Sequence, residues 1–273
     1  MPSLIDILKA VFLGIVEGIT EWLPISSTGH MILVNEFIGG EAGFFGTDLF
    51  LYGIQLGAIL AIVTLYFRKL NPFAPSKSRE EKHGTWQMWF KVVVACLPAA
   101  VIGLILNDFM DKFENWMVIS TTLILYGVGF ILIESYNKRR SVSVSSMNAM
   151  TYKTALIIGA FQVLSIVPGT SRSGATILGA MLIGCSREIS AEFSFFLAIP
   201  VMVGVSFLKL VTFEGVISST DWIILAVAMV VAYVVSMIAV KFLTSFVKRH
   251  DFKVFGWYRI VLGAAVVAYF LIF

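Results

Sequence analysis

Six long apolar stretches restrict this chain to one class of protein. Each is close to the ~20 residues that a helix needs to cross the hydrocarbon core of a bilayer. They occupy residues 49–67, 86–106, 116–136, 189–211, 222–246 and 254–273. Hydrophobic residues make up 58% of the 273 residues and charged residues only 14%, whereas soluble domains carry about 25% charged residues. We therefore expect an all-α polytopic membrane protein with six full transmembrane helices.

Two further apolar regions, residues 4–40 and 154–185, are interrupted halfway by Pro, Gly, Ser and Thr. Each interruption leaves two half-length pieces on either side of a polar tip. Non-helical backbone at membrane depth is tolerated only where protein or water shields it. Such pieces are therefore typical of re-entrant helical hairpins, and we expect two of them in addition to the six spans.

The charges of the loops alternate in sign along the chain. Basic residues dominate the loops after the first, third and fifth spans, and acidic residues dominate those after the second and fourth. Because cytoplasmic loops are enriched in Lys and Arg, the basic loops should face the cytoplasm. An odd number of crossings must then separate Lys153 from Glu214, so region 154–185 returns to its own side and region 4–40 enters from the outside. The basic residues cluster in a few loops and form no stripe of the kind that binds nucleic acid.

The two halves of the chain resemble each other. Shifting the sequence by 145 residues places the tip at 26–29 on the tip at 171–174. The same shift pairs Gly14 with Gly159, Glu17 with Gln162 and Ile32 with Ile177. Each half holds one hairpin and three spans, an odd number, so the second half should be upside down relative to the first. We predict a single membrane domain, 1–273, built as an inverted repeat of about 1–140 and 150–273.

The two tips carry residues suited to phosphoryl chemistry. Ser, Thr and Gly at a helix start expose backbone N–H groups that bind phosphate. Arginine offers a planar fork for phosphate oxygens, and histidine can act as an acid or base near neutral pH. We expect the substrate to be bound by Ser26, Thr28, Gly29, Gly169, Thr170, Ser171, Ser173 and Thr176. The ionisable residues that the two tips bring are Glu17, Glu21, His30 and Arg172.

Glu17 and Glu21 stand four residues apart and share one face of a helix, so they repel each other unless a proton or a cation lies between them. Oxygen ligands suit Mg²⁺ or Ca²⁺, which predicts a divalent cation held by this pair. Structural interpretations compete with these assignments. The glutamates could form a solvated helix face, the serines an N-cap, and Arg172 a bridge that satisfies backbone carbonyls.

The E-x-x-x-E pair with LPISSTGH (23–30), together with PGTSRSGAT (168–176), resembles the undecaprenyl-diphosphate phosphatase family. The resemblance extends over the whole chain. It implies an integral membrane enzyme that removes the terminal phosphate of undecaprenyl diphosphate, a polyprenyl diphosphate lipid. This recycles the lipid carrier for cell-wall synthesis and gives bacitracin resistance. The resemblance also implies a divalent cation and a site open to the outer face of the bacterial cytoplasmic membrane. Carried over residue by residue, it implies that the catalytic residues are Glu17, Glu21, Ser27, His30 and Arg172.

Two mechanisms and two functional classes remain open at this point. Ser27 could attack the terminal phosphorus while His30 relays protons and Arg172 holds the diphosphate; alternatively His30 is the nucleophile and Ser27 only binds phosphate. A transporter or flippase of a polyprenyl phosphate lipid would also use inverted repeats and polar tips. The sequence leaves open whether the chain forms a homodimer.

Overall fold

Helices joined by loops make up the fold, which the computed structural model describes over residues 2–38, 43–113 and 115–272. Strands are absent from these ranges, apart from one isolated bridge between Val144 and Cys185. The α-helices are α1 (Leu4–Thr20), α2 (Ser27–Ile38), α3 (Asp48–Leu65), α4 (Phe67–Leu70), α5 (Arg79–Met110), α6 (Trp116–Asn137), α7 (Tyr152–Val163), α8 (Arg172–Leu182), α9 (Arg187–Val211), α10 (Ser219–Phe246) and α11 (Lys253–Ile272). Short 3-10 turns are η1 (Phe44–Gly46), η2 (Asp111–Phe113) and η3 (Leu164–Ile166).

Six helices of the described chain are long and apolar enough to cross a membrane. They are α3, α5, α6, α9, α10 and α11, so the predicted all-α polytopic class and its six spans are confirmed. One boundary was wrong, since α5 begins at Arg79 and not at residue 86. The cause is a cap on the helix start. The Ser78 hydroxyl accepts a hydrogen bond from the Glu81 backbone N–H, and the Glu81 carboxylate accepts one from the Ser78 N–H.

The two interrupted regions each form a pair of short helices. In the first, α1 ends at Thr20, α2 begins at Ser27, and the two helices contact each other. In the second, α7 continues through η3, and α8 begins at Arg172 and packs against α7. These helices are too short to be counted among the six spans. That both hairpins enter the membrane and return to the same side stays a prediction.

The turns at the two tips have the same unusual backbone. Ser26 has φ 76° and Ser171 has φ 70°, a left-handed conformation that residues other than glycine seldom adopt. Each serine then caps the helix that follows it. The Ser26 hydroxyl accepts a hydrogen bond from Gly29 N, and the Ser171 hydroxyl accepts one from Gly174 N. These two serines are paired by the 145-residue shift, so the two tips share one local turn, while the inverted repeat itself stays a prediction.

A second pair of equivalent positions brings helices of the two halves into close contact. A Cβ added to Gly14 of α1 would lie 2.7 Å from the Ala228 carbonyl oxygen of α10. One added to Gly159 of α7 would lie 2.2 Å from the Ala95 carbonyl oxygen of α5. Only glycine permits these approaches. Each tip is therefore packed through its first helix against a span from the other half of the chain.

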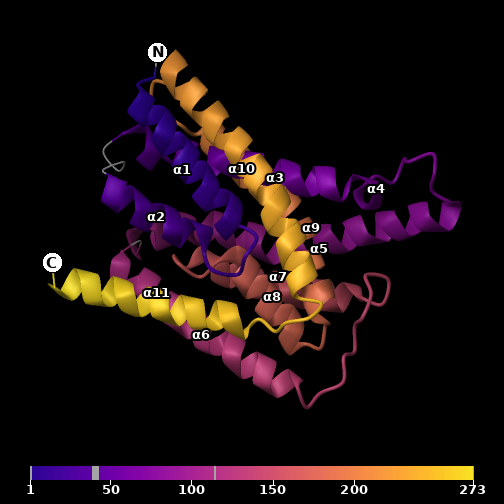
Figure 1. Ribbon diagram of the computed structural model, residues 1–273. Helices are drawn as coiled ribbons and strands as arrows, with labels where there is room; N and C mark the ends of the chain where they lie inside the picture. The colour runs from indigo at the N-terminus through magenta and orange to yellow at the C-terminus, as the bar shows by residue number, and fades with distance from the viewer. Residues whose placement is uncertain (1, 39–42, 114, 273) are drawn as a thin grey trace.

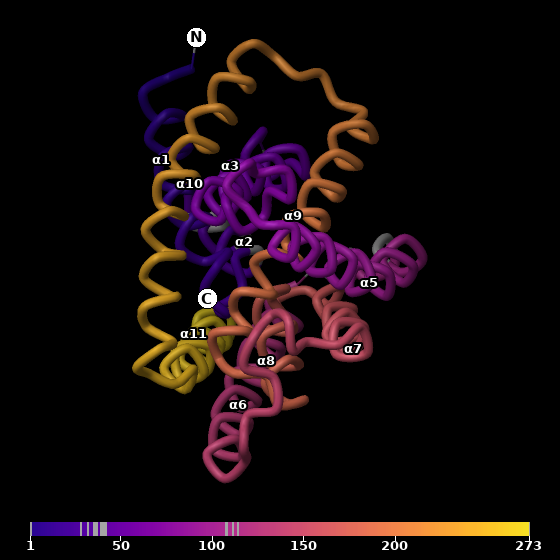
Figure 2. Tube along the Cα trace, turned by 90° about the vertical axis from the view of Figure 1, so that its right-hand side faces the viewer, coloured from indigo at the N-terminus to yellow at the C-terminus, as the bar shows by residue number. Residues whose placement is uncertain are grey.

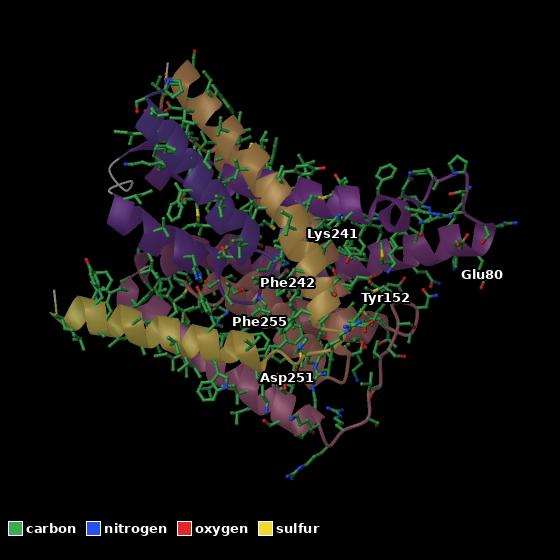
Figure 3. The ribbon with its side chains drawn as sticks, in the orientation of Figure 1. Glu80, Tyr152, Lys241, Phe242, Asp251 and Phe255 are labelled. Carbon is green, nitrogen blue, oxygen red and sulfur yellow. The ribbon has the colours of Figure 1, made fainter. Side chains whose placement is uncertain are left out.

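The helices arrange the loops of opposite charge at opposite ends of the molecule. Figure 1 shows both termini on the left, and the loops before α5, after α6 and after α10 on the right. α10 runs beside α1, and α11 beside α6, in the views of Figures 1 and 2. Glu80, near the start of α5, lies at the right-hand end in Figure 3. The basic loops thus share one end, as the predicted alternation of loop charge requires.

Candidate functional site

Glu21 joins the two tips through its carboxylate. It follows the last turn of α1, and only 6% of its surface is exposed. One oxygen accepts a hydrogen bond from the Ser27 hydroxyl at 2.5 Å, and the other accepts one from Arg172 Nη2 at 2.9 Å. Ser27 and Arg172 are the first residues of α2 and α8. The N-terminal ends of two helices, where backbone N–H groups are unpaired, are thereby held together at one buried carboxylate.

The second tip is fastened to α9 and to the first tip by further polar contacts. Arg172 Nη1 donates to the Ser194 carbonyl at 2.8 Å, and the Thr176 and Ser194 hydroxyls share a hydrogen bond of 2.7 Å. The Ser173 hydroxyl donates to the Glu21 carbonyl at 3.2 Å. Among the described residues, Arg172 Nε has no hydrogen-bond partner. The Nε donor of the guanidinium is therefore unpartnered while Nη2 binds Glu21.

Glu17 lies one turn before Glu21 on α1 and is 1% exposed. Its Oε1 atom has no partner in the described part of the chain, and neither polar atom of the equally buried Gln162 has one. Buried polar atoms without a partner are rare in proteins, so they indicate a place for water, a proton or an ion. Glu17 and Gln162 are the residues paired by the 145-residue shift, one from each tip.

The carboxylate pair fits a divalent cation that completes its shell with phosphate oxygens. Within ranges 2–38, 43–113 and 115–272, no group of three or more His, Cys, Asp or Glu side chains could hold a metal by itself. Mg²⁺, however, commonly uses one or two carboxylates plus the phosphates of its substrate. The unpartnered oxygen of Glu17 suits that role, whereas both oxygens of Glu21 already accept hydrogen bonds. The predicted cation stays a prediction.

His30 lies in the first turn of α2, and its ring forms hydrogen bonds with Ser26 and Tyr258 and not with the Ser27 hydroxyl. Nδ1 is 2.7 Å from the Ser26 carbonyl oxygen, and Nε2 is 2.8 Å from the Tyr258 hydroxyl. A carbonyl only accepts, so Nδ1 carries a proton and Nε2 of the neutral ring accepts from Tyr258. The structure thus gives Ser27 a carboxylate, Glu21, as its proton acceptor. A proton relay through His30 remains a prediction.

The other predicted binding residues shape the turns. Ser26, Gly29 and Ser171 take part in the two caps described above. Gly169 has φ 81°, and a Cβ there would lie 2.3 Å from Thr122 Oγ1, so only glycine fits this turn. The Thr170 carbonyl accepts a hydrogen bond from Arg259. The Thr28 side chain lies outside the described residues.

Three residues at the site were missed by the sequence analysis: Ser194, Tyr258 and Arg259. None lies in either tip motif, and all three belong to predicted spans. For Arg259 a signal was present, since a charged residue inside an apolar span marks a functional or structural site. For Ser194 and Tyr258 the sequence carries no comparable signal, because both residue types are common in membrane helices.

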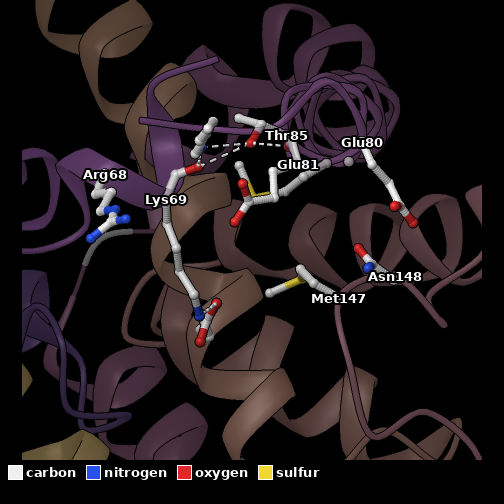
Figure 4. Close-up of a pocket in the computed structure, with 11 residues that line it drawn as sticks. Arg68, Lys69, Glu80, Glu81, Thr85, Met147 and Asn148 are labelled. Atoms are coloured by element: carbon white, nitrogen blue, oxygen red, sulfur yellow. Dashed lines mark hydrogen bonds and ion pairs between the residues drawn. The ribbon is translucent and has the colours of Figure 1, made fainter. Parts of the chain in front are cut away.

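A cleft at the charged end of the molecule is separate from these tips. It has a volume of about 510 Å³ and opens among α4, the start of α5 and the loop before α7 (Figure 4). Its charged lining residues are Arg68, Lys69, Lys77, Glu80, Glu81 and Glu192. The three positive and three negative charges balance, and no predicted site residue lines the cleft. We therefore place the candidate site at the tips.

Comparisons with known proteins identify the family of this chain. The family model described as "Bacitracin resistance protein BacA" matches residues 10–265. A relative from Enterococcus faecalis named undecaprenyl-diphosphatase is 57% identical over 96% of this chain and 97% of its own length. Relatives of the same name from Lactiplantibacillus plantarum and Acetivibrio thermocellus are 55% and 56% identical, each over 98% of this chain, and over 98% and 99% of their own lengths. The Glu21, Ser27 and Arg172 cluster is thus part of a chain that belongs to the BacA family.

Proposed function

We propose that this protein hydrolyses undecaprenyl diphosphate to undecaprenyl phosphate and inorganic phosphate. The observation that carries the proposal is the Glu21 carboxylate, which binds a serine hydroxyl from one tip and an arginine from the other. Relatives that share more than half of the residues over nearly the whole chain bear the name of this activity. A buried nucleophile, a base and a permanent cation at two helix N-termini are the groups that transfer of a phosphoryl group requires.

The geometry favours Ser27 as the nucleophile. Its oxygen attacks the terminal phosphorus while its proton passes to Glu21, which already accepts that hydrogen bond. The bond from phosphorus to the bridging oxygen breaks, and undecaprenyl phosphate leaves. Water then attacks the phosphoserine, the Ser27 oxygen regains the proton from Glu21, and inorganic phosphate is released.

Arg172 would stabilise the charge that develops on the phosphoryl group. In the resting site its Nη2 binds Glu21, and its Nε is unpartnered. Once Glu21 has accepted the proton, its attraction for the guanidinium weakens, because charged pairs make the stronger hydrogen bonds. The donors of Arg172 then become available to the phosphate oxygens, beside the free N–H groups at the starts of α2 and α8.

Glu17, through its unpartnered Oε1, would hold Mg²⁺ or Ca²⁺ with Glu21 beside it, and the cation would neutralise part of the charge on the diphosphate. Glu17 would otherwise be a buried carboxylate with an unpartnered oxygen beside a second carboxylate. The cation also explains why two acidic residues share one face of α1.

We place the protein in the bacterial cytoplasmic membrane with the tip of the first hairpin accessible from the outer face. The basic loops lie together at the opposite end from both chain termini (Figure 1). If that end is cytoplasmic, the first hairpin enters from the outside. Hydrolysis there would return the lipid carrier to cell-wall synthesis and lower the amount of diphosphate available to bacitracin.

A direct test uses purified protein in detergent with farnesyl diphosphate, a short-chain prenyl diphosphate. We expect farnesyl phosphate and inorganic phosphate in equal amounts. A transporter or flippase of a polyprenyl phosphate lipid, the competing class, would leave the diphosphate intact in this assay. Absence of phosphate release from folded protein would contradict the proposed function.

Glu21→Gln should lower kcat in this assay by about 10²-fold, the lower range of a general-base contribution. An amide has one acceptor oxygen, so its NH₂ group would face a donor, either the Ser27 hydroxyl or Arg172. Glu188→Gln, at an exposed glutamate in the first turn of α9, is the matched control and should keep wild-type activity. Equal activity of the two variants would exclude Glu21 as the base.

A further inference from the structure

Arg259 is a fully buried cation that contacts both tips. It lies in α11, and its exposed surface is 0%. Nη1 donates to the Pro24 carbonyl at 3.1 Å, and Nη2 donates to the Gly169 and Thr170 carbonyls at 3.1 Å each. Nε donates to the Leu123 carbonyl of α6 at 3.4 Å. Every donor atom of the guanidinium is therefore occupied by backbone from three segments of the chain.

The ion pairs found in the described residues do not include Arg259. Its charge is balanced by carbonyl dipoles and by the ring of Tyr126, whose centroid is 5.3 Å from the guanidinium carbon. An arginine without a carboxylate is rarely buried, because desolvation of the charge is costly. The hydrogen bonds of Arg259 must therefore offset this desolvation cost, which an apolar residue of similar size would not incur.

The carbonyls bound by Arg259 occupy equivalent places in the two halves. Pro24 and Gly169 are separated by the same 145 residues that separate Ser26 from Ser171. In both tips the bound carbonyl lies two residues before the serine with positive φ. One planar group with two terminal nitrogens thus binds the same point of two equivalent turns.

We propose that Arg259 is a positioning residue that sets the spacing of the two tips, so that Ser27 and Arg172 reach Glu21 together. This inference rests on the proposed function of that site. The left-handed serines are strained, and a strained turn persists only when surrounding contacts hold it. Arg259 supplies such contacts directly before both turns. The hydrogen bonds of its guanidinium to Leu123, Pro24, Gly169 and Thr170 include none of the three residues at the reacting centre.

Lysine cannot replace this arrangement. The guanidinium presents its donors in a fixed planar fork, which allows three separated carbonyls on the two tips to be bound at once. A lysine ammonium is a single point on a flexible chain, and it would satisfy one tip at a time. Arg259→Lys keeps the charge and therefore separates the effect of charge from the effect of geometry.

The test measures kcat, KM and hydrogen exchange of Arg259→Met and Arg259→Lys, each purified as folded protein in detergent. We expect kcat of Arg259→Met to fall by about 10²-fold, the scale of a misplacement of roughly 1 Å at a reacting centre. KM should change by less than about threefold, since the ground-state contacts to the lipid remain. Peptides 22–27 and 168–174 should both exchange faster, while those of α9 should not.

Arg187→Met is the matched control, because Arg187 is bonded to the buried Glu134 at the charged end, away from the tips. It should lower thermal stability but keep kcat per folded molecule and the exchange of both tips. If Arg259→Met does not fold, the test is made with Arg259→Lys alone. We expect kcat of that variant to fall by about tenfold.

Wild-type kcat in either folded Arg259 variant, or unchanged exchange at the two tips, would overturn the inference. Faster exchange at one tip alone would also overturn it, because the proposal requires both. If the wild-type protein releases no phosphate, the proposed function fails. The exchange measurement would still decide whether Arg259 holds the tips together.

Discussion

Ser27→Ala should reduce phosphate release by at least about 10⁴-fold, since removal of a covalent nucleophile leaves only binding and electrostatic stabilisation. The Ser27 hydroxyl donates a hydrogen bond to a Glu21 oxygen at 2.5 Å, so this serine has a proton acceptor in direct contact. The substitution deletes one oxygen and leaves Glu21 bonded to Arg172. The kcat for farnesyl diphosphate, measured on protein with an unchanged melting temperature, reports the effect.

Ser190→Ala controls for the loss of a buried serine. Ser190 is 1% exposed, and its hydroxyl donates to the carbonyl of Ser186, the N-cap residue of α9. We expect this variant to keep wild-type kcat. If Ser27→Ala retained a tenth or more of the wild-type kcat, Ser27 would be a phosphate-binding residue and the mechanism with His30 as nucleophile would gain support.

Arg172→Ala should lower kcat by about 10³-fold, which is the contribution found for arginines that stabilise phosphoryl transfer. Among the described residues, this side chain is the only cation bonded to Glu21, and it carries an unpartnered donor for the phosphate. Its removal also leaves the Glu21 carboxylate buried with the Ser27 hydroxyl alone. Added guanidinium ion should restore part of the activity, because the cavity left by the side chain accepts it.

Arg140→Ala is the matched control for Arg172. Arg140 donates to the Leu182 carbonyl at the last residue of α8, so both arginines are bound at the same helix but at opposite ends. It should retain activity within about twofold, as expected of an exposed residue far from the chemistry. Retention of most activity by Arg172→Ala, without added guanidinium, would exclude it as the group that stabilises the phosphoryl charge.

The spans and the tips could be predicted from the sequence because both depend on local information. Length and hydropathy identify a membrane helix, and Pro, Gly and Ser mark where one is interrupted. The boundary of α5 was missed because its start depends on the cap at Ser78, which lies outside the apolar stretch. The shift of 145 residues also pairs the two serines that have positive φ in the structure.

The pairing of side chains at the site could not be predicted in the same way. The sequence suggested that Glu21 acts with Glu17 and that Ser27 acts with His30. In the structure, Glu21 binds both Ser27 and Arg172, while His30 binds Tyr258. These contacts join residues up to 228 positions apart, and no local pattern records them. The residues that bind the tips, Ser194 of α9 and Tyr258 and Arg259 of α11, belong to helices without a motif.

The symmetry of the tips explains how one carboxylate can serve both. Ser27 and Arg172 are paired by the 145-residue shift and are the first residues of equivalent helices. The same position thus carries a nucleophile in one half and a cation in the other. Both reach Glu21, whose own equivalent position holds the apolar Ile166. The two halves keep the same turn and differ in the side chains that the chemistry uses.

The central claim is that Ser27 forms a covalent bond to phosphorus with Glu21 as its base. Rapid quenching of the reaction of prenyl diphosphate labelled in its terminal phosphate tests this most directly. A phosphoenzyme on Ser27, stable in acid and cleaved by base, is the predicted result. A label that is lost in acid, survives base and maps to His30 would contradict the account.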